Sequence, residues 1–354
     1  MPWYRASRTL TLAAVLVGVA ALPAALAGEP WTWMASPVGI AIGVRLDLVA
    51  ALLTAFVGLL GWVVATYSVT NLRGRARRSE IGAALFAAIA ALLLTVSGGS
   101  LVSIGVGWTL SGLAVAALVS RAGGHDATRS AALLRRHLLI GDGFLWAGIT
   151  VAALTLPTLE RARLDELDAG TSTTLVALLL LGAAVARSGL VPSHRWLPET
   201  AEAPSPVSAL LHAGVVNGAG VLVLLTWPLY AAAPAALLAL AVLGAASVVV
   251  GIWAGQARSD VKGRLACSTT SQMGYMSLQL GLGLPAAALM HLLGHGAYKS
   301  WLFLRAGGAV GRARTLVLPQ PLTSARQHGP ALLAVAVAGL LIIGGLAAER
   351  RRRG

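Results

Sequence analysis

Charged residues are scarce in this chain of 354 residues, and only one cysteine is present. Asp, Glu, Lys and Arg together make up 11% of the residues, whereas 57% are hydrophobic and the mean hydropathy is +0.78. A water-exposed surface needs more charge than this. The composition therefore excludes a soluble enzyme and predicts an all-α, polytopic membrane helix bundle.

The single cysteine, Cys267, lies in an apolar stretch. Disulfides and cysteine-based metal sites are therefore excluded, and we expect the thiol to be inert packing. No set of cysteine, histidine and carboxylate residues has the spacing of a zinc site. We expect neither a metal nor a cofactor in this chain, and no catalytic residue.

Acidic residues are also few, because 13 Asp and Glu stand against 27 Lys and Arg, which gives a net charge of +14. On a soluble chain this excess would suggest nucleic acid as a partner. Here the arginines lie between apolar runs rather than in one patch. They therefore indicate membrane topology, and we expect no nucleic-acid binding.

Membrane-spanning helices need roughly 20 mostly apolar residues, and the uncharged runs of the chain reach that length repeatedly. Two of the runs are long enough for two helices each, divided at Ser97–Ser100 and near Pro228 and Pro234. The sequence predicts about 11 spans: Thr9–Gly28, Asp47–Thr66, two in Ile81–Ser120, Leu138–Leu159, Thr174–Val191, two in Ala203–Gln256, Arg264–Gly283, Ala286–Gly307 and Ala331–Ala348. Residues 1–329 form the expected membrane domain, and residues 330–354 form an apolar segment with an arginine-rich tail.

The first and last spans have alternatives. Arg5, Arg8, the following apolar stretch and Ala25–Ala27 resemble a secretory signal peptide, although we expect a retained helix in so hydrophobic a chain. The last segment, Ala331–Ala348, would place Arg350–Arg353 outside the cell, against the positive-inside rule. A re-entrant or interfacial segment is the alternative there.

The loops alternate in charge, as expected when arginine-rich loops stay in the cytoplasm. The basic loops fall on the side of the N-terminus, which is therefore predicted inside: Arg73–Arg78, Arg121–Arg136, Arg258–Arg264, and Arg312 with Arg314. The opposite side receives Glu29, the neutral Ser97 turn and the acidic stretch Glu160–Asp168. The multi-pass chain is expected in the cell (inner) membrane with its lipids.

His291, His295 and Lys299 are ionisable residues on a helix that is otherwise apolar. Steps of four residues place them on one helix face. Because histidine titrates near neutrality and buried lysine can lose its proton, this face predicts a polar wire that hands protons along the helix. The alternative is two histidines that hydrogen-bond backbone carbonyls and a lysine that reaches the cytoplasmic edge.

Four prolines follow Arg187 before the chain reaches His212, and they cannot share one continuous helix. Non-helical backbone at membrane depth is tolerated where it is buried in protein or lines a wet cavity. The segment therefore predicts a discontinuous helix at a transport path. A plain cytoplasmic loop is the alternative, and it leaves Arg187 and His212 unexplained because both are flanked by apolar sequence.

Asp142 lies one turn inside its predicted span, where a carboxylate needs a cation such as Arg135, Arg136 or Arg187. A structural ion pair and a relay partner are both open. Lys262 precedes the helix that contains Cys267, and it is either a loop charge or a member of the same polar axis.

Three ordered motifs resemble one family. The antiporter-like subunits of respiratory complex I and of Mrp-type cation antiporters closely resemble HRWLPETAEAPSPVSALLHAGVV (His194–Val216), DVKGRLACSTTSQMGYM (Asp260–Met276) and HLLGHGAYKSWLFLRAG (His291–Gly307). The resemblance covers Arg45–Gly311. Within this superfamily, Val44–Ser68 and His212–Gly220 are most similar to DabB, the membrane subunit of two-component inorganic-carbon accumulation complexes.

The resemblance implies an antiporter-like fold with discontinuous helices, whose central axis of lysine, histidine and acidic residues moves H⁺ or Na⁺. His212, His291, His295 and Lys299 match axis positions, and Arg187 stands where the family usually has lysine. Arginine does not deprotonate in proteins, so Arg187 is expected to act as a fixed charge.

Two further departures from complex I favour DabB. Thr109 stands after Gly107-Trp108, where complex I subunits have a glutamate. The chain also lacks the later helix whose lysine closes the second half-channel of the family. By resemblance, a cytoplasmic DabA-like partner carries a zinc site similar to that of β-carbonic anhydrase, and ion influx would drive its hydration of CO2 to bicarbonate. The alternatives are a subunit of complex I or of an Mrp antiporter, and a non-conducting membrane anchor.

Overall fold

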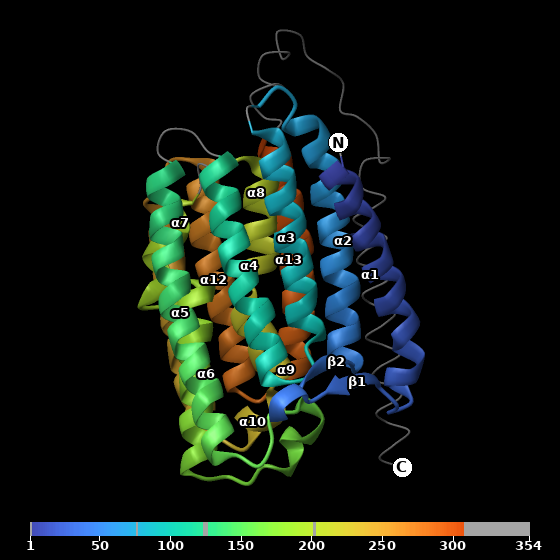
Figure 1. Cartoon of the computed structure of the whole chain (residues 1–354). Coiled ribbons are helices and arrows are strands. Elements are labelled where there is room, and N and C mark those ends of the chain that lie inside the picture. The colour runs from blue at the N-terminus through green and yellow to red at the C-terminus, as the bar shows by residue number, and fades with distance from the viewer. Residues whose placement is uncertain (1, 76, 123–126, 201–202, 308–354) are drawn as a thin grey trace.

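The computed structural model describes residues 2–75, 77–122, 127–200 and 203–307. In this part of the chain, long helices stand side by side in one bundle, and a two-stranded sheet lies across one end (Figure 1). The expected all-α membrane bundle with discontinuous helices is confirmed. The short β-hairpin is an addition that the apolar runs did not indicate.

The elements follow the chain in a simple order. They are α1 (Pro2–Leu26), β1 (Trp31–Ala35), the 3₁₀ turn η1 (Pro37–Gly39), β2 (Ile42–Leu46), α2 (Leu48–Asn71), α3 (Arg78–Ser97), α4 (Leu101–Ala122), α5 (Ala127–Thr155), the 3₁₀ turn η2 (Arg161–Glu166), α6 (Thr171–Ser188), the 3₁₀ turn η3 (Ser193–Arg195), α7 (Trp196–Glu199), α8 (Ser205–Leu210), the π turn η4 (Leu211–Val215), α9 (Gly218–Leu225), α10 (Trp227–Ala231), α11 (Pro234–Gln256), α12 (Val261–Gly281) and α13 (Pro285–Gly307).

Eight helical segments of the described residues are long and apolar enough to cross a membrane. Helices α12 and α13 have 21 and 23 residues but are not among these eight; α12 carries several serine, threonine and glutamine side chains, and α13 carries two histidines and a lysine. These ten segments correspond to the first ten of the expected spans. The eleventh, Ala331–Ala348, lies outside the described residues, as do residues 330–354 as a whole.

Small residues bring neighbouring helices close together, as they do in other membrane bundles. Helix α1 packs along α2 through Ser7, Thr11, Ala14 and Gly18, all of them buried. A Cβ atom at Gly18 would lie 2.6 Å from the backbone nitrogen of Ala55, so the helices touch backbone to backbone there. Whether this first helix is retained stays a prediction.

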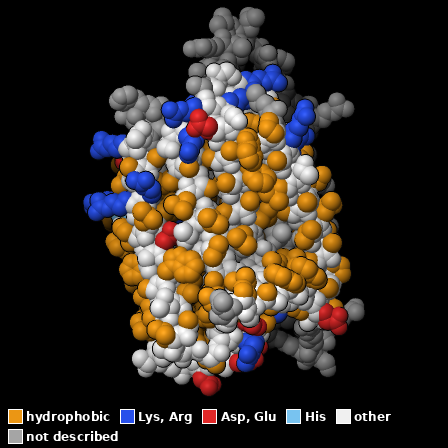
Figure 2. All heavy atoms as spheres, in the orientation of Figure 1, with side chains coloured by type: hydrophobic (Ala, Val, Ile, Leu, Met, Phe, Trp, Pro, Cys, Tyr) orange, Lys and Arg blue, Asp and Glu red, His pale blue; other side chains and the backbone are white. Residues whose placement is uncertain are grey.

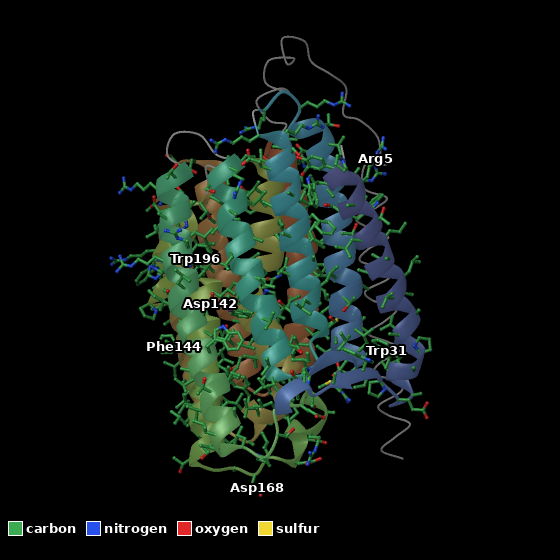
Figure 3. The ribbon with its side chains drawn as sticks, viewed as in Figure 1. Arg5, Trp31, Asp142, Phe144, Asp168 and Trp196 are labelled. Carbon is green, nitrogen blue, oxygen red and sulfur yellow. The ribbon has the colours of Figure 1, made fainter. Side chains whose placement is uncertain are left out.

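Basic side chains gather at one end of the bundle, where α3 begins and α4 ends, and an apolar belt covers the middle (Figure 2). Arg5 lies toward this end, whereas Asp168 lies at the opposite one (Figure 3). The described loops are thus divided between the two ends as the sequence suggested. Which end faces the cytoplasm stays a prediction.

Arg161 fastens the end that carries the hairpin. Its buried guanidinium donates hydrogen bonds to the Leu225 carbonyl at 2.9 Å and the Gly98 carbonyl at 3.0 Å. It also binds the Asp47 carboxylate at 2.6 Å. Arg45 also contacts Asp47, at 3.4 Å, but Arg161 is the closer partner. One side chain therefore ties together the start of α2, the turn between α3 and α4, and the end of α9.

The proline-rich stretch breaks the helix in two places. Between α6 and α8 the chain forms η3 and α7, which are 3 and 4 residues long. After α8 the backbone widens into the π turn η4 before α9 begins, and this places His212, which is fully buried, inside a non-α segment. Such π turns frequently occur at functional sites. The discontinuity that the prolines predicted therefore lies partly downstream of them.

Candidate functional site

Arg187 sits at the last turn of α6 and is only 2% exposed. Its guanidinium donates to the Trp108 carbonyl at 2.8 Å and hydrogen-bonds the Ser111 hydroxyl. The same group lies over the Trp108 ring, 4.2 Å from its centroid. Because carbonyl, hydroxyl and aromatic face all favour a cation, α4 holds the charge of Arg187 in one fixed position.

Asp142 lies on α5 with 6% of its surface exposed (Figure 3). It attracts Arg187 electrostatically, and the Trp108 side chain, over whose ring Arg187 lies, also interacts with the Asp142 carboxylate. Within the described chain the two residues do not form an ion pair at contact distance, and one Asp142 oxygen has no hydrogen-bond partner. Arg135 and Arg136, the other cations considered for Asp142, extend from the exposed side of α5.

The broken helix packs directly on the Arg187 cluster. A Cβ atom at Gly218 would lie 2.9 Å from Arg187 Cδ and from the edge of the Trp108 ring, so only glycine allows this contact. The backbone N–H of Ala219 donates to the Ser188 hydroxyl at 2.7 Å. Helix α9 therefore connects the end of α6 with the centre of the bundle.

His212 lies on the other side of this broken helix, in the π turn. Its ring stacks on Phe303 of α13 with centroids 4.4 Å apart. Both ring nitrogens are buried without a hydrogen-bond partner among the described residues. Buried polar atoms usually have a hydrogen-bond partner, so this ring can bind a water molecule or a passing ion.

His295 and Lys299 of α13 face the His212 side. The three groups interact electrostatically, and Lys262 contributes to the field at His212. Within the described residues, His295 is 6% exposed and neither of its ring nitrogens has a partner. Lys299 is 1% exposed, and its ammonium donates to the Leu265 carbonyl at 2.7 Å and the Ser268 hydroxyl at 2.8 Å. The lysine is thus buried in the bundle rather than extended to the membrane edge.

His291 continues the row one turn before His295, with ring centroids 6.2 Å apart. Its two ring nitrogens lie 3.1 Å from Oε1 of Gln279 and 2.9 Å from Oε1 of Gln272. A neutral imidazole donates from one nitrogen only, so two carbonyl partners suit the imidazolium. Turning either glutamine amide to present its NH2 group would suit the neutral ring equally well. The two glutamines can therefore hold both protonation states.

A cavity of about 530 Å³ runs along this row between α12 and α13. Its polar lining includes Ser268, Gln272, His291, His295 and Lys299. The cavity is open on one side, where Tyr298 of α13 is exposed. The polar lining leaves room for water beside the histidines and the lysine.

Lys262 is half-buried at the start of α12, and its ammonium donates to the Ala203 carbonyl at 2.8 Å. It therefore joins the segment that precedes α8 to α12 at the basic end of the bundle. This position is compatible with both interpretations of the sequence, since the residue contacts a loop carbonyl and also contributes to the field at His212.

The candidate residues fall into two clusters, one with Asp142 and Arg187 and one with His212, His291, His295 and Lys299, with Lys262 near the second. Sequence reasoning missed Ser111, Gln272, Gln279 and Phe303. Ser268, Gln272 and Gln279 are four and seven residues apart and so share one face of α12, which could have indicated a polar stripe. Ser111 and Phe303 carry no comparable signal.

Residues 98–347 match the family described as NADH:quinone oxidoreductase/Mrp antiporter, TM. NADH-quinone oxidoreductase subunit L of Mycobacterium tuberculosis is 34% identical over 311 residues, which are 84% of this chain and 48% of that protein. The probable inorganic carbon transporter subunit DabB2 of Halothiobacillus neapolitanus is 31% identical over 290 residues, which are 78% of this chain and 51% of that protein. The chain spans about half the length of these curated relatives.

Solved structures share the fold. The Mrp complex from Dietzia sp. DQ12-45-1b contains a chain with a TM-score of 0.74 and 21% identity, covering 85% of this chain and 58% of that one. A chain of the membrane-bound sulfane sulfur reductase, an archaeal respiratory membrane complex, gives a TM-score of 0.75 at 19% identity, over 85% of this chain and 64% of that one. The chain therefore belongs to the family of antiporter-like membrane subunits that NADH:quinone oxidoreductases and Mrp antiporters share.

Proposed function

We propose that the chain is an ion-conducting subunit of a multi-subunit membrane complex of the complex I or Mrp type, and that it moves H⁺ or Na⁺ along α13. The observation that carries the proposal is the meeting of His212, His295 and Lys299 in the buried centre of the bundle. Ionisable groups at membrane depth are costly and mark ion paths by default.

Proton transfer suits this cluster better than a static role. Histidine and lysine can both release a proton, and the ring nitrogens of His212 and His295 have no partner within the described chain. The cavity beside His291 supplies room for water between the groups. Arg187 keeps its proton, so we assign it a fixed charge that holds the broken helix and influences the path electrostatically.

The relatives favour this reading over a specific role in inorganic-carbon uptake. The subunit L relative belongs to a redox complex, and the Dietzia structure is an Mrp complex. Both support conduction within a larger assembly, in which the remaining subunits supply the driving reaction.

A second candidate function is the membrane subunit of a two-component inorganic-carbon transporter. It is supported by the DabB2 relative and by Thr109, whose hydroxyl accepts a hydrogen bond from Trp146 where complex I subunits carry a glutamate. In this reading a cytoplasmic DabA-like protein with a zinc site similar to that of β-carbonic anhydrase would use the ion influx to hydrate CO2. The basic end of the bundle, which we predict to be cytoplasmic, would be its docking face.

Flux through the purified complex tests conduction. A tagged chain is isolated with its bound proteins, reconstituted in liposomes and challenged with an imposed H⁺ or Na⁺ gradient. We expect uptake of one of the ions above that of empty liposomes, and loss of the uptake in Lys299→Ala. Uptake equal to that of empty liposomes for the parental complex would leave a membrane anchor as the function.

The bound proteins distinguish the two candidate functions. Redox subunits or further Mrp subunits in the preparation would identify the first, whereas a single soluble zinc protein would identify the second. Growth gives an independent measurement. In cells that need added CO2, only the second function predicts that growth in air is restored when the chain is expressed with its DabA-like partner. The second function also predicts no rescue by the chain alone.

A further inference from the structure

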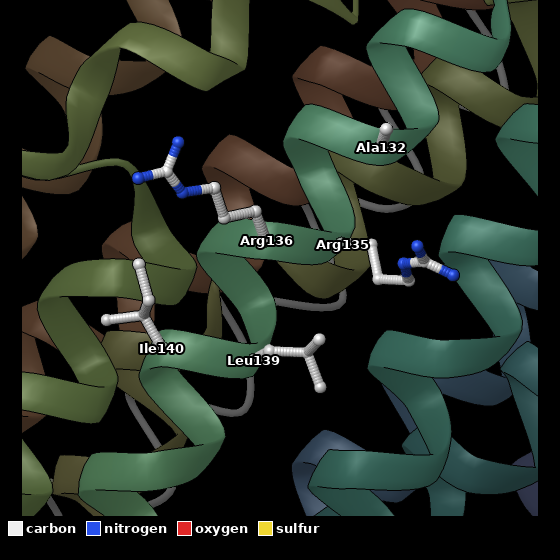
Figure 4. A pocket seen from close by; sticks show the side chains of 5 residues that line it. All are labelled: Ala132, Arg135, Arg136, Leu139 and Ile140. Atoms are coloured by element: carbon white, nitrogen blue, oxygen red, sulfur yellow. The ribbon is translucent and has the colours of Figure 1, made fainter.

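The exposed side of α5 carries two pairs of residues that the ion path does not use. Arg135 and Arg136 extend to opposite sides of the helix, with Leu139 and Ile140 one turn further along (Figure 4). Because residues four apart lie on one helix face, each arginine is paired with an aliphatic side chain. Together with Ala132, these four residues line a shallow, open pocket on the surface of α5.

The two arginines differ from other basic residues at this end of the bundle. Arg121 contacts Glu80 at 3.2 Å, and Arg258 contacts Glu199 at 3.8 Å. Neither Arg135 nor Arg136 has an ion-pair or hydrogen-bond partner within the described ranges 2–75, 77–122, 127–200 and 203–307. Their guanidinium groups are therefore free to bind an anion from outside this part of the chain.

The length of α5 fixes the depth of the pocket. The helix has 29 residues, whereas about 20 are enough to cross the hydrocarbon core. If the span ends with the helix at Thr155, its other boundary falls near Arg136. The arginines then lie at the level of the lipid headgroups, and Leu139 and Ile140, which are 51% and 46% exposed, lie within the hydrocarbon.

We propose that this pocket binds an anionic phospholipid. Its phosphate would accept hydrogen bonds from Arg135 or Arg136, and an acyl chain would cover Leu139, Ile140 and the exposed ring of Phe144 further along α5. Arginine suits a phosphate because its planar group donates two parallel hydrogen bonds.

The apolar half of the pocket separates a lipid from an acidic soluble protein. A protein that approaches the basic end would meet Arg129 before Arg135, since Arg129 lies nearer the start of α5. It would leave Leu139 and Ile140 uncovered. A phospholipid can bind the arginines with its phosphate and cover the aliphatic side chains with an acyl chain, whereas free phosphate can bind only the arginines.

Binding of phosphatidylglycerol to the detergent-purified complex tests the proposal. The double variant Arg135→Gln, Arg136→Gln should bind about 25-fold more weakly, because each basic residue near a membrane surface contributes about fivefold. Arg129→Gln, an exposed control on the same helix, should change the affinity less than about twofold. Phosphatidylcholine and inorganic phosphate should not compete at the concentration that saturates phosphatidylglycerol.

Three outcomes would overturn the lipid site. The first is that the double variant binds phosphatidylglycerol as tightly as the parent does. The second is that inorganic phosphate competes as well as the lipid does, which would identify a simple anion site. The third is that the double variant loses a bound acidic protein while its binding of phosphatidylglycerol stays unchanged. Thermal unfolding of each variant checks that the fold is intact, which we expect because all the changed side chains are exposed.

Discussion

Two buried cations define the two halves of the site, and they are held differently. Arg187 has a carbonyl, a hydroxyl and the face of Trp108 around its guanidinium. Lys299 also has a carbonyl and a hydroxyl, but the groups beyond it are His295 and His212, whose ring nitrogens have no partner in the described structure.

The difference separates a fixed charge from an exchangeable one. A guanidinium keeps its proton and holds its partners in a rigid geometry, whereas an ammonium beside unpaired imidazoles can pass a proton on. We therefore expect substitutions around Lys299 to stop transport without unfolding the bundle. Substitutions around Arg187 should affect stability and transport together.

The largest expected effect is the loss of flux in Lys299→Ala and in His295→Ala. Each variant removes a buried ionisable group from the row on α13, so ion uptake by the reconstituted complex should fall to the level of empty liposomes. Lys299→Arg should fail as well, because it keeps the charge but not the exchangeable proton. Ser300→Ala is the control, since among the described residues the Ser300 hydroxyl bonds only the Ala297 carbonyl of its own helix.

Parental flux in Lys299→Ala and His295→Ala would show that the row is structural. Parental flux in Lys299→Arg alone would show that the charge of Lys299 matters and its proton does not. The contrast with Arg187 would then disappear.

The second effect concerns Arg187→Met, which removes the fixed charge. It removes the guanidinium that the Trp108 carbonyl and the Ser111 hydroxyl bind, although these two groups still bond each other at 2.8 Å, and it leaves Asp142 without its nearby cation. We therefore expect a loss of about 1–3 kcal/mol in the free energy of unfolding. Flux should be lost as well. Arg187→Lys should retain part of both, because it keeps the charge but not the forked geometry. Denaturant titration in mixed micelles and liposome flux measure the two effects, and a Met variant that matches the parent in both would contradict the fixed-charge role.

The third effect is on stability alone. Arg161→Gln removes a buried guanidinium that binds Asp47 and the carbonyls of Gly98 and Leu225, at the end of the bundle far from Lys299. We expect a loss of about 2 kcal/mol in the free energy of unfolding. Flux per folded complex should remain at the parental level, and a selective loss of flux would place Arg161 in the ion path instead. Arg163→Gln, in the same turn but exposed, is the matched control.

Much of the fold could be predicted from the sequence because membrane insertion imposes a simple length and polarity rule. The described helices fall where the uncharged runs lie, including the pair divided at Ser97–Ser100. The hairpin was not predicted because Trp31–Leu46 is a short connection that the rule for membrane spans does not describe. Its position depends on distant contacts, such as the bond from the Gly43 N–H to the Ser103 hydroxyl.

The site could be predicted only in part. Spacings of four residues placed His291, His295 and Lys299 on one face, because helix periodicity is local. The contact of His212 with Phe303 and of Arg187 with Trp108 joins segments far apart in the chain, and no local pattern specifies such pairs. The proline-rich run indicated a broken helix, but the π turn around His212 depends on packing against α13.

The smallest expected effect is at Gln279, which contacts His291 from α12. Gln279→Ala removes one of the two amide partners of the imidazole and leaves Gln272 in place. If His291 exchanges protons, the remaining glutamine can still hold one ring nitrogen, and water from the open cavity can replace the other. We therefore expect flux to fall only a few-fold, about what the loss of one net hydrogen bond of about 1 kcal/mol implies. The double variant Gln272→Ala with Gln279→Ala should reduce the flux further, whereas His291→Ala should reduce the flux most. Equal flux in all three variants and the parent would limit the conducting row to His212, His295 and Lys299, and would make His291 a polar lining residue of the cavity.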